Sequence, residues 1–177
     1  DESYEKYIYD GRERYSPAAN ADLRSRTITI QSFSKGYALF AYRLGYLAAP
    51  PSVTSACRRV LEWIDIYLGA VPQHAALAAL TGPSGWIGEM LAGWQAARDR
   101  FVAGMQAIPG LTPVTPEGTG FAFLDVTAFG RSSVEVARLL LNGYGIPSVP
   151  GSVFQGEGRL RLGFGGTPHV QQQVLDG

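Results

Sequence analysis

The sequence predicts an α/β protein, because short β-rich segments alternate with longer segments of helical periodicity along most of the chain. Residues 27–32 form a β-branched run that is typical of a buried strand. Apolar residues between positions 84 and 108 recur every three or four positions, as they do on one face of a helix. Hydrophobic residues make up 46% of the 177, which is ordinary for a chain that forms a folded core.

The first part of the chain is predicted to contain two strands, at residues 27–32 and 43–49, joined by a loop rich in glycine and aromatic residues. Two helices are predicted after them, over about 52–67 and 72–82. A longer amphipathic helix follows over 84–108. Its charged residues, among them Arg98, are expected on the solvent-exposed side of the helix.

The rest of the chain is predicted to alternate strands with helices. Strands are expected at residues 111–114, 120–126, 146–149 and 159–164. Ser132 and Glu135 have the spacing of a capping box, which predicts a helix that begins there and ends at Gly143. Thr167 and Pro168 precede a last helix. This alternation predicts a second α/β arrangement that is separate from the first part of the chain.

Composition and charge exclude several classes of protein. The formal net charge is zero, which argues against an electrostatic partner such as nucleic acid or an anionic membrane surface. No apolar run reaches the length that crosses a bilayer, so no membrane partner is expected. The single cysteine, Cys57, excludes an internal disulfide and fits a reducing compartment, so we expect a cytoplasmic protein.

Lysine is rare in this chain, which draws attention to Lys35. Of the 15 cationic residues, 13 are arginines, and only Lys6 and Lys35 are lysines. Lys35 closes the segment Ser32-Phe33-Ser34-Lys35 at the end of a predicted strand. A lysine amine can lose its proton and act as a nucleophile, which a guanidinium group cannot do. The residues alone leave two interpretations open, a reactive amine or a surface lysine at the start of a loop.

Other polar side chains have the types that an enzyme with a phosphorylated pyridine aldehyde needs. Such a site requires an amine for the aldehyde, a carboxylate for the ring nitrogen, and a phenol for the ring hydroxyl. It also requires hydroxyl and guanidinium groups for the phosphate, and a second guanidinium for a substrate carboxylate. Each residue alone is an everyday structural residue. The candidates are Asp1, Tyr4, Ser32, Ser34, Lys35, Arg43 and Arg161.

The order and spacing of these residues resemble the carboxyl-terminal half of the class I/II aminotransferases, which have the aspartate aminotransferase fold of the fold-type I pyridoxal-phosphate enzymes. Residues 1–4 match the family's Asp-x-x-Tyr block, residues 32–35 its Ser-x-x-Lys block, and residues 43–46 its Arg-x-Gly-Tyr block. Weaker similarities occur at residues 72–77, 120–123, 149–154 and 160–164. One such motif is weak evidence, whereas an ordered set over about 160 residues is strong.

The resemblance implies roles in the covalent chemistry for three residues. Lys35 would join covalently to pyridoxal 5′-phosphate, and would later move a proton between the carbon atoms of the substrate and the cofactor. Asp1 would pair with the protonated ring nitrogen. Tyr4 would form a hydrogen bond with the ring hydroxyl.

The resemblance also implies roles in anion binding. Ser32 and Arg43 would bind the cofactor phosphate, with Ser34 assisting. Arg161 would bind the substrate α-carboxylate. Arg159 lies on the same face of the same predicted strand, and we expect it either to face solvent or to extend the anionic reach of the site.

The resemblance further implies the domain organisation. Residues 1–83 would be the carboxyl-terminal part of the large cofactor-binding domain, with part of its mostly parallel sheet and a connecting helix. Residues 84–177 would be its small α/β carboxyl-terminal domain. Nothing in the sequence corresponds to the family's amino-terminal half, so we expect that half in the full protein or in a complementary chain. A homodimer is implied as well.

The function implied is that of an aminotransferase, which passes an amino group from an amino acid to a 2-oxo acid. A lyase, a decarboxylase or an oxidase of amino acids could use the same scaffold, because a fold does not fix the reaction. Further alternatives are a non-catalytic effector domain of a transcription regulator and a degenerate remnant. The loop ends in Ala41-Tyr42-Arg43 where the family usually has glycine and tryptophan before the arginine, which argues against a narrow substrate assignment.

Overall fold

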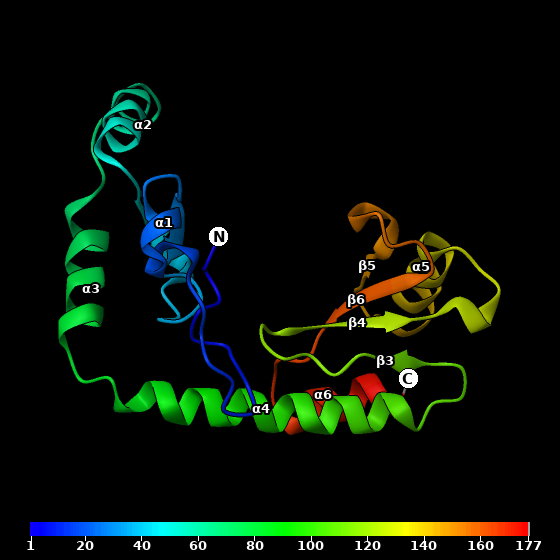
Figure 1. Cartoon of the computed structure of the whole chain (residues 1–177). Helices are drawn as coiled ribbons and strands as arrows, with labels where there is room; N and C mark the ends of the chain where they lie inside the picture. Colours follow the sequence, from blue (N-terminus) through cyan, green and yellow to red (C-terminus); the bar gives the residue numbers. More distant parts are fainter. Residues whose placement is uncertain (177) are drawn as a thin grey trace. The chain divides into compact units, whose positions relative to one another are not determined.

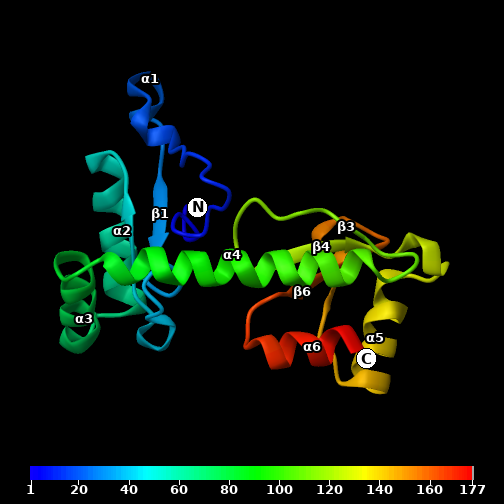
Figure 2. The same ribbon diagram turned by 90° about the horizontal axis from the view of Figure 1, so that it is seen from below.

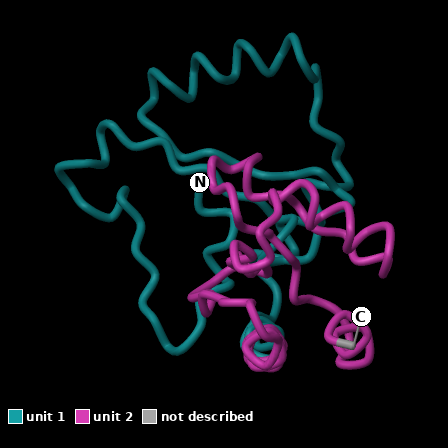
Figure 3. Tube along the Cα trace, turned by 90° about the vertical axis from the view of Figure 1, so that its right-hand side faces the viewer, with its two compact units in different colours: residues 1–91 teal, residues 92–177 magenta. Residues whose placement is uncertain are grey.

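The computed structural model describes residues 1–176, and the chain divides into two compact units, residues 1–91 and 92–177 (Figure 3). Each unit contains its own sheet, with two strands in the first and four in the second. The predicted boundary between residues 83 and 84 concerns the domains of a larger protein and stays a prediction.

The first unit contains a short hairpin-like sheet followed by helices. Its elements are the 3-10 helix η1 (Pro17–Ala19), α1 (Ala21–Arg24), β1 (Thr29–Ser32), the 3-10 helix η2 (Phe40–Tyr42), β2 (Gly45–Ala48), α2 (Pro51–Ile64), α3 (Ala70–Thr81) and the start of α4 (Gly85–Gln106).

The two strands of the first unit are antiparallel, with Thr29 opposite Ala48 and Ser32 opposite Gly45. The expectation of a mostly parallel sheet is therefore wrong for this structure, and the pairs of the second unit are antiparallel too. The physical reason lies in the connections. Parallel neighbours need a crossover, usually a helix, that returns the chain to the starting edge. Between β1 and β2 the chain forms only turns and the short η2, so it reverses direction.

Helices α2 and α3 (Figure 2) carry several apolar side chains that are exposed in the first unit, among them Val60, Trp63 and Leu77. Trp63 is 93% exposed, and Ile64 and Tyr67 are also exposed. Large apolar side chains exposed close together in the sequence often pack against another part of a protein or a partner. The buried apolar side chains of this unit instead lie around β1, where Tyr7, Tyr9 and Phe33 are the largest.

The second unit is built on a four-stranded sheet of order β3-β4-β6-β5. Its elements after α4 are β3 (Thr112–Pro113), β4 (Phe121–Asp125), the 3-10 helix η3 (Thr127–Phe129), α5 (Ser133–Tyr144), β5 (Val149–Pro150), the 3-10 helix η4 (Gly151–Phe154), β6 (Arg159–Gly163) and α6 (Pro168–Asp176). The predicted strands and helices all exist, with ends that differ by a few residues.

One face of this sheet forms the core of the second unit. Leu160 and Leu162 of β6 are buried, whereas Arg159 and Arg161 alternate with them and lie on the other face. Helix α6 lies alongside the second half of α4 (Figure 1). Gln171 of α6 fixes this contact because its side-chain amide donates hydrogen bonds to the carbonyl oxygens of Ala97 and Phe164.

The capping box predicted at the start of α5 is confirmed. The Glu135 N–H donates to Ser132 Oγ at 3.3 Å, and the Ser132 N–H donates to Glu135 Oε2 at 2.9 Å. The helix continues to Tyr144, one residue past its predicted end at Gly143.

Arg98 contradicts the expectation that the charged residues of the long helix face solvent. It is 3% exposed, and its guanidinium donates to the carbonyl oxygen of Pro116 at 3.1 Å and to Asp99 Oδ1 at 2.8 Å. The loop before β4 thus covers the side of α4 that the helical pattern predicted to be exposed to solvent. Among the described residues, no helix combines the length and the apolar character that a membrane span requires.

Candidate active site

Lys35 lies in the tight turn that follows β1. The Phe33 N–H donates to the Leu44 carbonyl oxygen at 3.1 Å, which closes the loop between the two strands. The Lys35 carbonyl oxygen accepts from the Ala38 N–H at 3.0 Å and from the Tyr7 hydroxyl at 3.2 Å. The backbone that carries this lysine is therefore held from within the turn and from the preceding segment.

The side-chain amine of Lys35 differs from that of the other lysine. Its Nζ atom lies 5.6 Å from the centre of the Tyr4 ring and has no hydrogen bond or ion pair with residues 1–176. Lys6 Nζ, in contrast, pairs with Glu5 at 3.4 Å and lies over the ring of Tyr37. Of the two lysines, Lys35 alone keeps an uncommitted amine beside a phenol.

Ser32, Ser34 and Arg43 lie at the same end of the two-stranded sheet as Lys35. This placement follows from the antiparallel register, in which the last residue of β1 faces Gly45, the first of β2. The Ser34 N–H donates to Ser32 Oγ at 3.1 Å. Arg43 has a left-handed backbone with φ +52°, and its Nη1 donates to the Phe40 carbonyl oxygen. Its other N–H groups have no partner in the described part of the chain.

Gly45 lets β2 approach β1 at this end. A Cβ atom at position 45 would lie 2.5 Å from the carbonyl oxygen of Gln31, closer than packed atoms allow. The glycine two positions after Arg43 is thus needed for the pairing that brings Arg43 to the end of the sheet where Ser32 lies.

Asp1 and Tyr4 belong to the first segment of the chain, which forms turns over residues 3–6 and lies beside β1. The Glu2 N–H donates to the Ile30 carbonyl oxygen at 2.8 Å and so attaches this segment to the strand. Asp1 is exposed, and its Oδ1 accepts from the Ser3 N–H at 2.9 Å. The structure thus brings Tyr4 to the amine of Lys35 and places Asp1 beside the same strand.

A polar network that the sequence did not predict supports this segment. Gln31 of β1 is buried, and its amide donates to Glu5 Oε2 at 3.1 Å. Arg14 pairs with Glu5 and also with Glu2, the latter at 3.2 Å. The role of Tyr7 was not predicted from the sequence either, although Tyr7 follows Tyr4 by only three residues. Burial raises the pKa of Tyr7, so its hydroxyl stays protonated and donates to Lys35.

Arg161 lies in the second unit, on β6, between two aromatic rings. Its guanidinium carbon is 4.6 Å from the centre of the Phe121 ring and 4.9 Å from the centre of the Phe154 ring. The side chain is half-buried and forms no ion pair or hydrogen bond with the described residues. A planar cation without a carboxylate partner is available to an incoming anion.

Arg159 is committed to a partner within the fold. Its Nη2 lies 3.4 Å from Asp125 Oδ2, directly across the sheet from it. Hydrogen bonds from the Thr127 side chain and backbone lower the pKa of Asp125, and the charge of Arg159 lowers it further. Arg159 is therefore paired with Asp125 while its side chain stays partly exposed, and its contribution to the anionic reach of the site stays a prediction.

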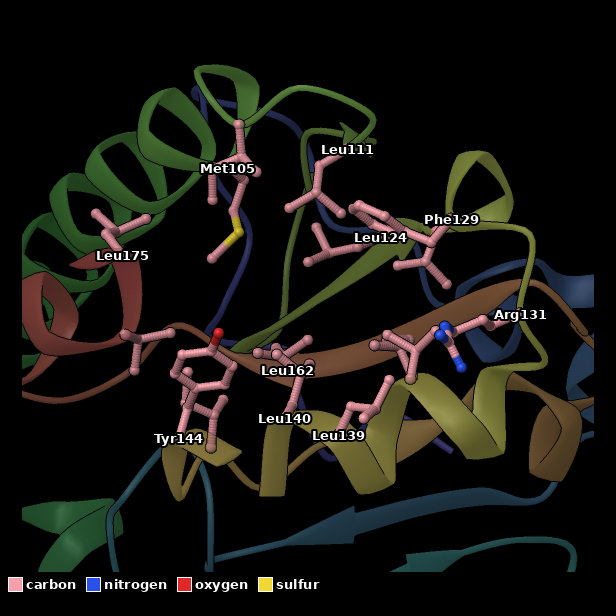
Figure 4. Close-up of a pocket in the computed structure, with 16 residues that line it drawn as sticks. Met105, Leu111, Leu124, Phe129, Arg131, Leu139, Leu140, Tyr144, Leu162 and Leu175 are labelled. Carbon is pink, nitrogen blue, oxygen red and sulfur yellow. The ribbon is translucent and has the colours of Figure 1, made fainter. Parts of the chain in front are cut away.

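An apolar pocket of about 300 Å³ lies on the opposite face of this sheet (Figure 4). Met105, Leu124, Leu162 and Leu175 point into it, and Arg131 is its single charged residue. It contains none of the predicted site residues. Residues 1–176 also hold no cluster of three or more His, Cys, Asp or Glu side chains that could bind a metal ion.

The molecule so described is a mixed α/β chain with an uncommitted lysine amine in one unit and an uncommitted arginine in the other. The profile of the family "Aminotransferase class I and II" matches residues 1–177. The chain therefore belongs to the class I and II aminotransferase family.

Relatives and solved structures agree with this family. The chain is 33% identical over 179 residues to an aspartate aminotransferase of Musicola paradisiaca, covering 99% of this chain and 45% of that protein. It is 32% identical over 184 residues to aromatic-amino-acid aminotransferase 2 of Thermococcus litoralis, covering 99% and 46%.

Two crystal structures show the same fold. The aspartate aminotransferase of Rhizobium meliloti superposes with a TM-score of 0.95 at 27% identity, over 99% of this chain and 47% of that one. The aromatic aminotransferase of Pyrococcus horikoshii gives 0.94 at 28% identity, over 99% and 48%. The chain thus spans about half the length of the proteins it matches.

Proposed function

We propose that the protein containing this chain is a pyridoxal-phosphate-dependent aminotransferase, which transfers an amino group from an amino acid to a 2-oxo acid. The observation that carries the proposal is the amine of Lys35. It occupies the family's Ser-x-x-Lys position, on a turn held from two sides, and has no hydrogen bond or ion pair with the described residues. The names of the relatives, aspartate and aromatic aminotransferases, support amino acid substrates.

The side chains of the first unit fit the cofactor in type. Lys35 offers an uncommitted amine for an aldehyde, and Arg43 offers guanidinium N–H groups for a phosphate. The Ser32 oxygen already accepts a backbone N–H, which leaves its own hydroxyl proton to donate to the same phosphate. Asp1 offers a carboxylate oxygen beyond the one that accepts from Ser3.

The chemistry divides between the cofactor and the protein. When bound, pyridoxal phosphate supplies an aldehyde and a ring that accepts electrons. Lys35 would hold the cofactor through its side-chain amine, and the free amine would take the proton from the substrate α-carbon and return it as a general acid. Asp1 would keep the ring nitrogen protonated, and the Tyr4 hydroxyl would donate a hydrogen bond to the ring oxygen.

Anion binding completes the proposed roles. Ser32, Ser34 and Arg43 hold the phosphate, and Arg161 binds the substrate α-carboxylate in a bidentate way, as a guanidinium fork does best. The half of the relatives' length that this chain does not span would come from the same protein or from a complementary chain, and the active form would be a homodimer. We further propose a cytoplasmic location.

A pair of lysine variants tests the proposal. In the whole protein, Lys35→Arg keeps the positive charge but removes the amine that can bond to an aldehyde. We expect this variant to lose turnover and to carry no cofactor after borohydride reduction, as read by peptide mass spectrometry, while some non-covalent cofactor binding remains. Lys6→Arg is the matched control, and it should keep both turnover and the covalent label.

A substrate panel separates the possible reactions. Amino acids added to the whole protein should convert the cofactor to its amine form, seen by absorbance, and a 2-oxo acid should reverse the change. Ammonia or peroxide as a product would indicate a lyase or an oxidase, and carbon dioxide a decarboxylase. Cofactor binding without turnover would indicate a regulatory domain. Undiminished turnover in Lys35→Arg would refute the assignment.

A further inference from the structure

Two aromatic rings that come from different elements lie close to the guanidinium of Arg161. Phe121 lies on β4, and Phe154 ends the short helix η4. Both ring centres lie within 5 Å of the guanidinium carbon, at 4.6 and 4.9 Å. At such separations a guanidinium is attracted to an aromatic face, and it also stacks against it.

The backbone fixes both rings. Phe121 lies opposite Gly163, two residues beyond Arg161 on the neighbouring strand, so ring and guanidinium are diagonal neighbours on one sheet face. Phe154 follows Gly151, where a Cβ atom would overlap the carbonyl oxygen of Gly156. The Gly156 N–H donates to the Gly151 carbonyl oxygen at 2.9 Å and closes this loop.

We propose that Phe121 and Phe154 are positioning residues that hold the guanidinium of Arg161 in the orientation that binds a carboxylate. The inference rests on the proposed function, in which Arg161 takes the substrate α-carboxylate. Two rings this close restrict the orientations of the guanidinium, whose N–H groups can make two parallel hydrogen bonds to a carboxylate. A long side chain that is already ordered loses less conformational entropy on binding.

Arg159 shows the contrasting arrangement on the same strand. Its guanidinium carbon lies 6.0 Å from a single ring, that of Phe123, and its charge is satisfied by Asp125. Arg159 thus has one distant ring and a carboxylate partner. Arg161 has two close rings and no carboxylate partner. The rings therefore take the orienting role that a carboxylate partner has elsewhere, without neutralising the charge.

Ring-removing variants of the whole protein test the inference. Phe154→Leu and Phe121→Leu keep apolar bulk but remove the aromatic face. Each should raise KM for the amino acid, and Kd for maleate measured by calorimetry, by about 3- to 10-fold, the range expected for one cation–π contact. The kcat should stay within about twofold, as for binding that is equal in ground and transition states. Phe154→Tyr should restore both constants.

Two controls separate positioning from general damage. Phe129→Leu removes an exposed ring of η3 in the same unit, and should change neither constant. In an Arg161→Lys background, Phe154→Leu should add less than about twofold, because residues that act through one group are not additive. Thermal unfolding identifies any variant that fails to fold, in which case the other ring variant decides.

The outcomes distinguish this inference from the proposed function. Unchanged KM and maleate Kd in both folded ring variants would overturn the inference while leaving the function intact. A full effect of Phe154→Leu in the Arg161→Lys background would also overturn it, because the ring would then act independently of Arg161. Absence of transamination in the wild-type protein would refute the proposed function. The Kd values for maleate would still support or reject the role of the rings.

Discussion

Position 45 illustrates how a single residue controls the candidate site. Gly45→Ala would place a methyl group 2.5 Å from the Gln31 carbonyl oxygen, and backbone atoms cannot move aside cheaply. We expect this variant to lose about 1–3 kcal/mol of stability, as overpacking typically costs. We also expect weaker cofactor binding, because β2 begins two residues after Arg43 and its pairing with β1 positions that residue. Urea unfolding and a cofactor titration measure the two effects.

Gly88→Ala is the matched control within the same unit. A Cβ atom at position 88 meets nothing within 4 Å, and the residue lies inside α4. Alanine is the better helix former, so this variant should gain about 0.5–1 kcal/mol. A Gly45→Ala variant as stable as wild type would show that the two strands do not approach as closely as described.

Residue types and spacing named the candidate site residues, whose roles stay predictions, but they did not show the contacts around those residues. Lys35, Arg43 and Arg161 could be named from the sequence because residue type and spacing along the chain are both visible there. That the Tyr7 hydroxyl reaches the Lys35 carbonyl, 28 residues away, could not, because it depends on how two segments pack. The ion pair of Arg159 became visible only with the register of β6 on β4.

At the scale of elements, the start of α5 depends on a carboxylate from a distant loop. Glu157 Oε1 accepts from the Ser133 N–H, and Oε2 accepts from the Ser133 hydroxyl at 3.0 Å. These hydrogen bonds, with one from the Gly158 N–H, lower the pKa of Glu157 below its ordinary value. The carboxylate thus stabilises the fold above the unfolded pKa of about 4.3, and this contribution is lost as the pH falls through the lower folded value.

Glu157→Gln tests this contribution. The variant should be less stable than wild type at pH 7, and its loss of stability between pH 5 and pH 3 should be smaller, because the group that takes up a proton is gone. Urea midpoints of the second unit at several pH values measure both. Glu89→Gln, an exposed carboxylate of α4, should leave the midpoints near those of wild type. Equal pH dependence in Glu157→Gln and wild type would contradict the argument.

Elements were predictable where local rules determine them. The capping box of α5 involves residues three apart, so the sequence contained the whole motif. Strand direction is not local. The mostly parallel sheet was expected from the complete fold of the resembling family, whereas the described strands pair antiparallel, both across the short connection between β1 and β2 and across the long one between β4 and β6. The prediction that Arg98 faces solvent was wrong for a related reason, because a helical pattern does not show which loop will cover a helix.

At the scale of the whole molecule, the two units differ in how completely they bury their apolar residues. The second unit has a core of Phe101, Met105, Leu124, Leu160 and Phe164, each at most 3% exposed. The first unit leaves Trp63 and Tyr67 exposed to 93% and 86%. Covering a large apolar side chain stabilises a protein by about 1.5–3 kcal/mol. The uncovered surface of α2 and α3 therefore fits a chain that spans about half the length of its relatives.

Trp63 reports whether the rest of the protein covers this surface. In residues 1–177 expressed alone, acrylamide should quench the fluorescence that is lost on Trp63→Phe, because the indole is open to solvent. In the whole protein, this component should be quenched several times less and emit at shorter wavelength, because apolar neighbours replace water. Trp94→Phe is the control, since Trp94 is half-buried against Phe164 within its own unit and should change less between the two forms. Equal quenching of Trp63 in both forms would show that this part of α2 faces solvent in the whole protein too.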